Sequence, residues 1–254
     1  MGYFFDAETG GPARLELLSI DGHDFQVLRR LGHHSDAYEV PFVFPADLET
    51  FRTDMASVPN VFTWLVPRSG EFLPAAVLHD AIVGDDANHT GPRVDRVEGD
   101  RVFRAAMADL GTGRVRVWLM WAAVSMVTLW VAPHHRWWHR AALLLTLISI
   151  TIIGLLATAD LADVWNVLPW MGERPLVTEL VGGALGAVII PALLALSWGR
   201  LWLAGVITGW ALAFLVHVTI LVSAVYALYW LVERVVSGPR DDHSVHWESR
   251  WSRR

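Results

Sequence analysis

Six side chains capable of chemistry lie between residues 51 and 103, within the segments FRTDMASVPN, FLPAAVLHDA and RVEGDRVF. They are Asp54, Ser57, His79, Asp80, Arg96 and Asp100. An imidazole that meets several carboxylates can bind a divalent metal through nitrogen and oxygen atoms. The same groups can instead form a buried hydrogen-bonded network that holds a fold together. The residue types alone leave both interpretations open.

Under the metal interpretation, the chain is a metal-dependent hydrolase that acts near the cell envelope. Its catalytic and metal-binding candidates are Asp54, His79, Asp80 and Asp100, and its supporting residues are Thr53, Ser57 and Arg96. Under the structural interpretation, His79 is a core histidine bonded to Asp54 or Asp100. Whether the chain is an enzyme therefore stays open.

Two further catalytic interpretations have less support. An all-helical class of metal phosphohydrolases also uses an adjacent His-Asp pair, and His33 or His34 could supply its upstream ligand. The N-terminal third looks like strands, however, which opposes an all-helical fold. Ser57 has no Gly-x-Ser-x-Gly elbow around it, so helix capping explains it better than nucleophilic catalysis.

The elements that must position these groups begin with strands. Residues 25–31 and 38–44 are rich in β-formers and flank a polar segment, 32–36, which predicts a hairpin or meander. Pro41 and Pro45 predict that the second run is an edge strand or an irregular one.

Helices are expected after the strands. Pro59 and Pro67 bound a short helix over 59–66, and apolar spacing predicts a second helix over 74–83 with His79 on its apolar face. A third helix runs from Asp95 to Gly111. Asp100 lies on its buried stripe, where an unpaired charge would cost several kcal/mol, so it needs a partner.

Several separated motifs in this region resemble the DUF1353 family of bacteria and phages. The matching residues are Phe51, Thr53, Asp54, Ala56, Ser57, Val58, Pro59, Ala75, Ala76, His79, Asp80, Arg96, Asp100, Phe103, Ala123 and Val124. The family's usual Leu is Met55 here, and the usual aromatic residue after His-Asp is Ala81. The resemblance covers roughly residues 25–127. It identifies a domain and implies no particular reaction.

Charge and composition exclude several classes. Residues 1–117 carry 18 acidic side chains and 11 Arg, while residues 118–254 carry 8 and 9. The net charge of −6 provides no basic footprint for nucleic acid. The absence of cysteine excludes disulfides and thiolate metal sites. The first residues show no secretory signal, so we expect the acidic part to be cytoplasmic.

The second half of the chain predicts a membrane region. Residues 141–159, 180–198 and 201–232 contain no charge, and each run is near or above the roughly 20 residues that cross a bilayer. Residues 117–132 are either the last helix of the domain or a fourth span. His217 lies within the third run and is expected to bond a neighbouring helix. No second ionisable group is expected in the spans.

Together these observations predict an α+β N-terminal domain, of short strands followed by helices, joined to three or four transmembrane helices. The expected division is a soluble domain over 1–132, a transmembrane region over 133–232 and a polar tail over 233–254. We expect the chain to be an integral protein of the bacterial cytoplasmic membrane, with membrane lipid as its partner. Its function is expected to be that of a tethered binding or structural module, or else of the hydrolase above with a divalent metal.

Overall fold

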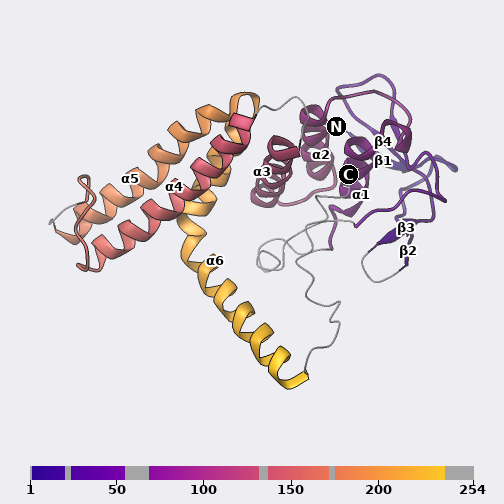
Figure 1. Cartoon of the computed structure of the whole chain (residues 1–254). Helices are drawn as coiled ribbons and strands as arrows, with labels where there is room; N and C mark the ends of the chain where they lie inside the picture. Colours follow the sequence, from indigo (N-terminus) through magenta and orange to yellow (C-terminus); the bar gives the residue numbers. More distant parts are fainter. Residues whose placement is uncertain (1, 21–23, 55–68, 132–136, 172–174, 238–254) are drawn as a thin grey trace.

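The computed structural model describes residues 2–20, 24–54, 69–131, 137–171 and 175–237. It has two visible parts, an N-terminal domain of short strands and helices and an arm of long helices (Figure 1). The predicted fold class is therefore confirmed. The helix expected over 59–66 lies outside the described residues.

Two small antiparallel sheets form the first part of the domain. One has the order β1 (Tyr3–Asp6), β4 (Leu31–His34), β5 (Phe42–Phe44), and the other pairs β2 (Leu17–Ser19) with β3 (Phe25–Val27). β5 lies at an edge of its sheet, as the two flanking prolines predicted.

The polar turn expected over residues 32–36 was placed wrongly. Gly32, His33 and His34 belong to β4, and Gly32 pairs with Phe5 on one side and Val43 on the other. The Phe5 ring lies over Gly32, so a side chain at this position would collide with the ring and force it to move. Pairing on both sides outweighs the turn-like composition of the segment.

Helices α1 (Leu73–Gly84) and α2 (Arg96–Asp109) follow, joined by the short helix η2 (Asp86–Asn88). The predicted bounds of both long helices are confirmed to within two residues. Asp95 caps α2 by accepting a 2.8 Å hydrogen bond from the Glu98 amide, and Gly111, with φ of 78°, follows the end of the helix.

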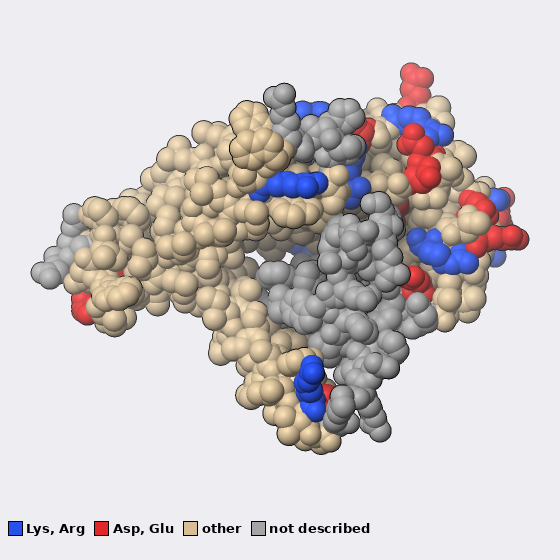
Figure 2. Space-filling model, in the orientation of Figure 1, with Lys and Arg blue, Asp and Glu red and all other residues tan. Residues whose placement is uncertain are grey.

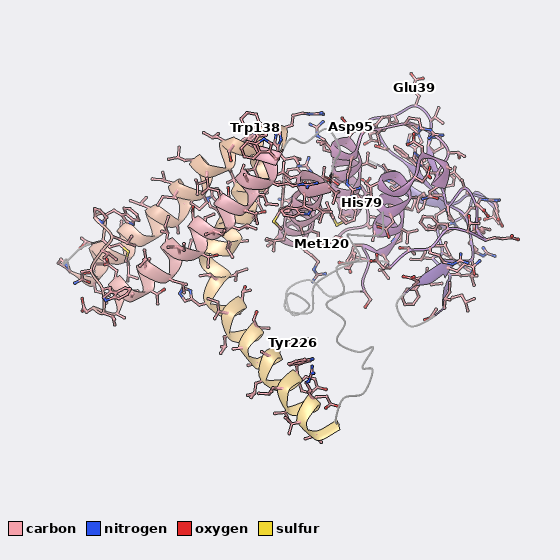
Figure 3. The ribbon with its side chains drawn as sticks, viewed as in Figure 1. Glu39, His79, Asp95, Met120, Trp138 and Tyr226 are labelled. Atoms are coloured by element: carbon pink, nitrogen blue, oxygen red, sulfur yellow. The ribbon has the colours of Figure 1, made fainter. Side chains whose placement is uncertain are left out.

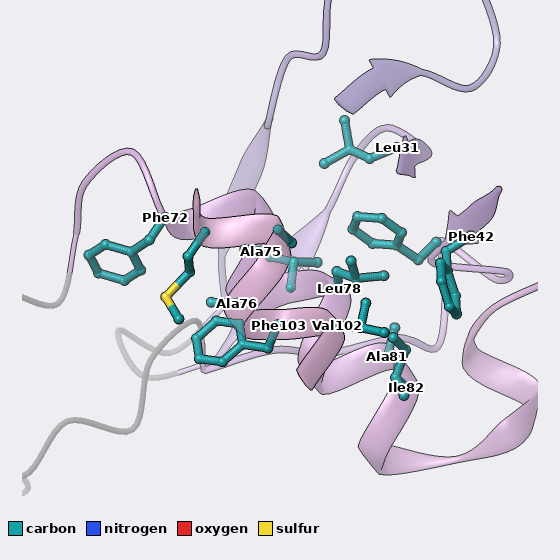
Figure 4. Close-up of a cluster of buried hydrophobic side chains, with 14 of the residues drawn as sticks. Leu31, Phe42, Phe72, Ala75, Ala76, Leu78, Ala81, Ile82, Val102 and Phe103 are labelled. Carbon is teal, nitrogen blue, oxygen red and sulfur yellow. The ribbon is translucent and has the colours of Figure 1, made fainter. Parts of the chain in front are cut away.

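The domain core lies where α1 and α2 meet the sheet (Figure 4). Aromatic side chains from both sides fill it, and they are Phe42, Phe44, Phe51, Phe72 and Phe103. Between them lie Leu31, Leu78 and several alanines of α1, which allow the helices to approach closely. This apolar setting is the environment of the His79 ring.

Helix α3 (Arg114–Val131) belongs to two cores at once. Val117 and Met120 complete the core of the domain. From the next residue onward, Trp121, Ala122 and Leu129 pack in a second apolar cluster with residues of α4, η3 and α6. The helix therefore connects the domain to the arm through continuous packing.

The arm consists of α4 (Trp137–Leu161), α5 (Leu176–Ala195), η3 (Leu196–Leu201) and α6 (Trp202–Ser237). Three helical runs in the described chain are long and apolar enough to cross a membrane: Arg114–Val131, Trp137–Leu161 and Leu176–Val236. The last contains both α5 and α6, which a break at Gly199 separates (φ 60°, ψ −121°).

α4 and α5 lie side by side, and the first half of α6 packs on both of them (Figure 1). The second half of α6 leaves them as a lone helix, and no residue after Val216 is buried in it. Charged side chains gather on the domain, while the arm is almost wholly uncharged (Figure 2). This division matches the split in charge along the sequence.

Candidate functional site

The centre of the candidate site is a hydrogen bond between α1 and α2. His79 Nε2 lies 2.8 Å from Asp100 Oδ1. Asp100 is fully buried, and only 8% of His79 is exposed. The imidazole also packs against the Phe103 ring, with 4.9 Å between ring centroids. The partner predicted for Asp100 is therefore confirmed, and Figure 3 shows His79 inside the domain, away from the arm.

The second carboxylate oxygen of Asp100, Oδ2, is buried and is left without a hydrogen bond among the described residues. An unsatisfied buried acceptor costs roughly 1–3 kcal/mol, and more when it carries charge. The hydrogen bond to His79 is therefore the main interaction that offsets the free-energy cost of burying this carboxylate.

A second pair connects the loop before residue 55 to α1. The Thr53 hydroxyl donates a 2.5 Å hydrogen bond to Asp80 Oδ2. The Thr53 backbone also exchanges two hydrogen bonds with Phe25, of 2.8 and 3.0 Å, in an isolated bridge. Thr53 is buried, whereas Asp54 and Asp80 are half-buried. Thr53 therefore joins β3, the loop and α1 at one point.

The predicted metal set receives no support from this geometry. All four candidate ligands are described, yet the described residues contain no group of three or more His, Asp or Glu side chains placed to hold a metal ion. The structure instead shows two pairs, His79 with Asp100 and Thr53 with Asp80. Ser57, predicted as a supporting residue, lies outside the described residues.

Arg96 fulfils a supporting role that links three helices. Its Nη1 donates to the Val83 carbonyl at the end of α1, at 3.2 Å, and its Nε donates to the Thr128 hydroxyl on α3, at 3.1 Å. Because Arg96 begins α2, these bonds fix the relative positions of α1, α2 and α3. Thr128 is fully buried, and nothing in the apolar run around it identified it as a partner for arginine.

Sequence reasoning also missed a second histidine–carboxylate pair. His33 of β4 is fully buried, and its Nε2 lies 3.3 Å from Asp109 Oδ2 at the end of α2. Burial lowers the pKa of His33, and the hydrogen bond to Asp109 opposes this shift. His33 thus pairs with Asp109 from a strand, and the all-helical phosphohydrolase interpretation has no counterpart here.

The fold and its buried pairs define a small α+β domain that a packed helix joins to an apolar helical arm. Residues 27–124 match the model of the DUF1353 family, described as a protein of unknown function. This segment is therefore a DUF1353 domain, as the motifs predicted, and it ends inside α3. No curated protein and no solved structure matches the chain.

Proposed function

We propose that the chain is a membrane-tethered binding or structural module in which α3 fixes the DUF1353 domain to the membrane helices. The observation that supports this most strongly is the double packing of α3. Val117 and Met120 lie in the core of the domain, while Trp121 and Leu129 lie in the cluster with the arm. A flexible linker would leave the domain free to move, whereas this helix holds it in one orientation.

We also propose that the chain crosses the membrane three times rather than four. Arg200, in the turn between α5 and α6, lies 3.2 Å from Asp95 at the start of α2. This contact supports a topology in which the domain and this turn lie on one side of the membrane. If α3 also crossed the bilayer, the start of α4 and the turn at Arg200 would lie opposite the domain. We infer that α4, α5 and α6 are the spans and that α3 is the last helix of the domain.

The same arrangement supports a cytoplasmic domain. Arg140 and Arg200 both lie at the domain end of the arm, where Arg140 donates to the Trp130 carbonyl at 2.8 Å. Asp160 and Asp163 lie at the opposite end, at the α4–α5 loop. Arginine in short loops favours the cytoplasmic side, which supports a cytoplasmic domain. The bacterial inner membrane is the location proposed for it.

Thiol labelling tests the tethering and the topology together. The chain has no cysteine, so single substitutions Glu39→Cys, Val164→Cys and Val236→Cys each report one position. These sites lie in the domain, in the α4–α5 loop and near the end of α6, and all are exposed. A membrane-impermeant maleimide should label Val164→Cys and Val236→Cys in intact cells, and Glu39→Cys only after lysis.

Other labelling patterns would contradict this topology. With α3 as a fourth span, all three positions would lie on one side and would label together. Labelling of Glu39→Cys alone in intact cells would reverse the proposed orientation. Extraction of the full chain by alkaline carbonate, without detergent, would contradict the membrane tether itself.

The metal-dependent hydrolase remains a second candidate on one observation, the unpaired Oδ2 of Asp100. A cation could satisfy that oxygen, and His79 would then be its neighbour. Elemental analysis of the purified full-length chain tests this. We expect no stoichiometric metal. About one equivalent, lost in Asp100→Asn, would instead establish the metal site and favour the hydrolase.

A further inference from the structure

Arg104 of α2 is stacked against two tryptophans of α3. Its guanidinium carbon is 4.3 Å from the centroid of the Trp118 ring and 4.9 Å from that of Trp121. Within the described part of the chain, Arg104 forms neither an ion pair nor a hydrogen bond. Stacking occupies the flat face of a guanidinium and leaves its N–H edge for carboxylate or phosphate oxygens. The surface where α2 meets α3 therefore holds a cation whose hydrogen-bonding edge is unused.

Two further arginines lie close to this stack. Arg101 is one turn earlier on α2 and pairs with Glu98 at 3.0 Å. Arg114 is one turn before Trp118 on α3, is exposed, and has no ion pair among the residues that the structure describes. Burial and, to a smaller extent, the charge of Arg101 lower the pKa of Arg104. Positive charge therefore gathers here on an otherwise acidic domain, and it favours an anionic partner.

The Trp121 indole adds a second unused donor. Its Nε1 atom is buried and has no hydrogen-bond partner in the described chain, although buried indole N–H groups usually have one. Trp198, in the same apolar cluster, shows the usual case, because its Nε1 donates to the Thr146 hydroxyl at 3.1 Å. Arg104 and Trp121 are thus neighbouring donors that both lack an acceptor, which is the complement of an anionic oxygen.

Exposed tryptophans gather where the arm meets the domain. They lie on α3, in the first turn of α4 and at the start of α6, and they are Trp118, Trp130, Trp137, Trp138 and Trp202. Figure 3 shows Trp138 at this end of the arm. Tryptophan rings prefer the headgroup level of a bilayer. Trp121 packs here with Leu143 of α4 and Ala204 of α6, so the Arg104 stack lies at the same level.

We propose that Arg104, Trp118 and Trp121 form a binding site for the phosphate of an anionic phospholipid. The inference rests on the proposed membrane tether, which brings α3 to the headgroup level. The Arg104 edge and the Trp121 N–H donate to the phosphate oxygens, while Trp118 packs beside the glycerol. Arg101 and Arg114 attract a head of net negative charge and repel the choline of a zwitterionic one. A lipid bound here holds the DUF1353 domain against the membrane surface.

Native mass spectrometry of the full-length protein in detergent tests the proposal, because each bound lipid appears as a separate increase in mass. The protein is titrated with dioleoyl phosphatidylglycerol, dioleoyl phosphatidylcholine, dioleoylglycerol and glycerophosphoglycerol. We expect the first phosphatidylglycerol to bind about tenfold more tightly than phosphatidylcholine. Dioleoylglycerol lacks the phosphate and glycerophosphoglycerol lacks the acyl chains, so both should bind poorly. Equal affinity for the two phospholipids, or equally tight binding of glycerophosphoglycerol, would overturn the proposal.

Four variants locate the site. Arg104→Gln should abolish the preference for phosphatidylglycerol, whereas Arg104→Lys keeps a cation and should keep part of it. Trp121→Phe removes the indole N–H and should weaken phosphatidylglycerol binding several-fold, which also tests the site if Arg104→Gln fails to fold. Arg14→Gln is the matched control, since Arg14 is exposed and precedes β2, on the side of the domain away from the arm (Figure 1). Equal lipid preference in Arg104→Gln and Arg14→Gln would overturn the assignment.

Failure of the membrane tether gives a different result from failure of the lipid site. Without the tether, alkaline carbonate extracts the wild-type chain from the membrane. A chain that stays in the membrane after carbonate treatment, yet binds phosphatidylglycerol no better than phosphatidylcholine, would contradict the lipid site alone.

Discussion

His79 and Asp100 are 21 residues apart in the sequence, yet Nε2 of one lies 2.8 Å from Oδ1 of the other inside the DUF1353 domain. The bond crosses between α1 and α2 within an aromatic core. Asp100 is fully buried, and its other oxygen has no partner among the described residues. The hydrogen bond to His79 is therefore the main interaction that allows the Asp100 carboxylate to be buried in the folded domain.

Removal of either partner should destabilise the domain, but to different degrees. His79→Ala leaves the Asp100 carboxylate buried with neither oxygen paired, which costs about 3–5 kcal/mol. Asp100→Ala leaves an imidazole N–H unpaired, which costs about 1–3 kcal/mol. Thermal unfolding of the detergent-purified chain should show the larger drop for His79→Ala, on the order of 6–20 °C.

A surface ion pair provides the control for these variants. Asp86 pairs with Arg93 at 2.9 Å, and both side chains are more than half exposed. Asp86→Ala should change the melting temperature by no more than about 2 °C, because exposed pairs contribute little. If His79→Ala and Asp86→Ala behaved alike, the buried pair would have no structural role.

The sequence predicted that His79 would bond Asp54 or Asp100, and the structure selects Asp100. Helical spacing placed His79 and Asp100 on apolar faces, and a buried carboxylate needs a partner, so the contact could be anticipated. His33 could not be placed, because Gly32, His33 and His34 have the composition of a turn. Only pairing with β1 and β5, which is tertiary information, makes them a strand.

The ends of the helices and the surfaces that they pack against were also harder to predict from the sequence. The first turn of α5 was left out of the expected span because a search for charge-free runs stops at Glu179. The helix itself begins at Leu176 and continues through this residue. The double role of α3 depends on which residues face the domain and which face the arm. Hydropathy does not distinguish a core from a bilayer, so the sequence alone left residues 117–132 open between a domain helix and a fourth span.

His33 should make the domain sensitive to acid. Burial lowers its pKa below the ordinary value of 6.5, and Asp109 only partly opposes this. The folded state therefore binds fewer protons than the unfolded chain, so its stability is complete above pH 6.5 and falls as pH drops below it. The limiting slope for one proton is about 1.4 kcal/mol per pH unit.

Melting temperatures measured between about pH 5 and pH 8 test this, since the window brackets the ordinary histidine pKa. His33→Gln can still bond Asp109 but cannot gain a proton, so its melting temperature should vary less below pH 6.5. His34→Gln is the control, because the His34 ring stacks on Tyr3 and is not buried. An unchanged slope in His33→Gln would assign the acid sensitivity to other groups.

Arg96 should be irreplaceable by lysine. Its planar head reaches the Val83 carbonyl and the Thr128 hydroxyl with two different nitrogens, which one ammonium group cannot reproduce in the same directions. Arg96→Lys should lower the melting temperature by roughly 2–8 °C, from the loss of hydrogen bonds at about 1–2 kcal/mol.

Thr128→Val separates the two contacts of Arg96. It removes the hydroxyl with almost no change in shape, so it should reproduce part of the effect. The double variant should then lose less than the sum of the two single changes, because both disrupt one hydrogen bond. Strict additivity would show that Arg96 and Thr128 act independently.

Asp95 should matter as a helix cap and very little as an ion pair. One oxygen accepts from the Glu98 amide at 2.8 Å, and this backbone hydrogen bond is the main cause that lowers its pKa. The other lies 3.2 Å from Arg200, with 57% and 69% of the two side chains exposed. Loss of a cap costs about 1 kcal/mol, whereas an exposed pair typically contributes less.

Asp95→Ala should therefore lower the melting temperature by roughly 2–4 °C. Asp95→Ser, which can still cap α2, and Arg200→Gln should both remain near the wild type. An equal loss in Arg200→Gln and Asp95→Ala would instead show that the ion pair itself holds the α5–α6 turn against the domain.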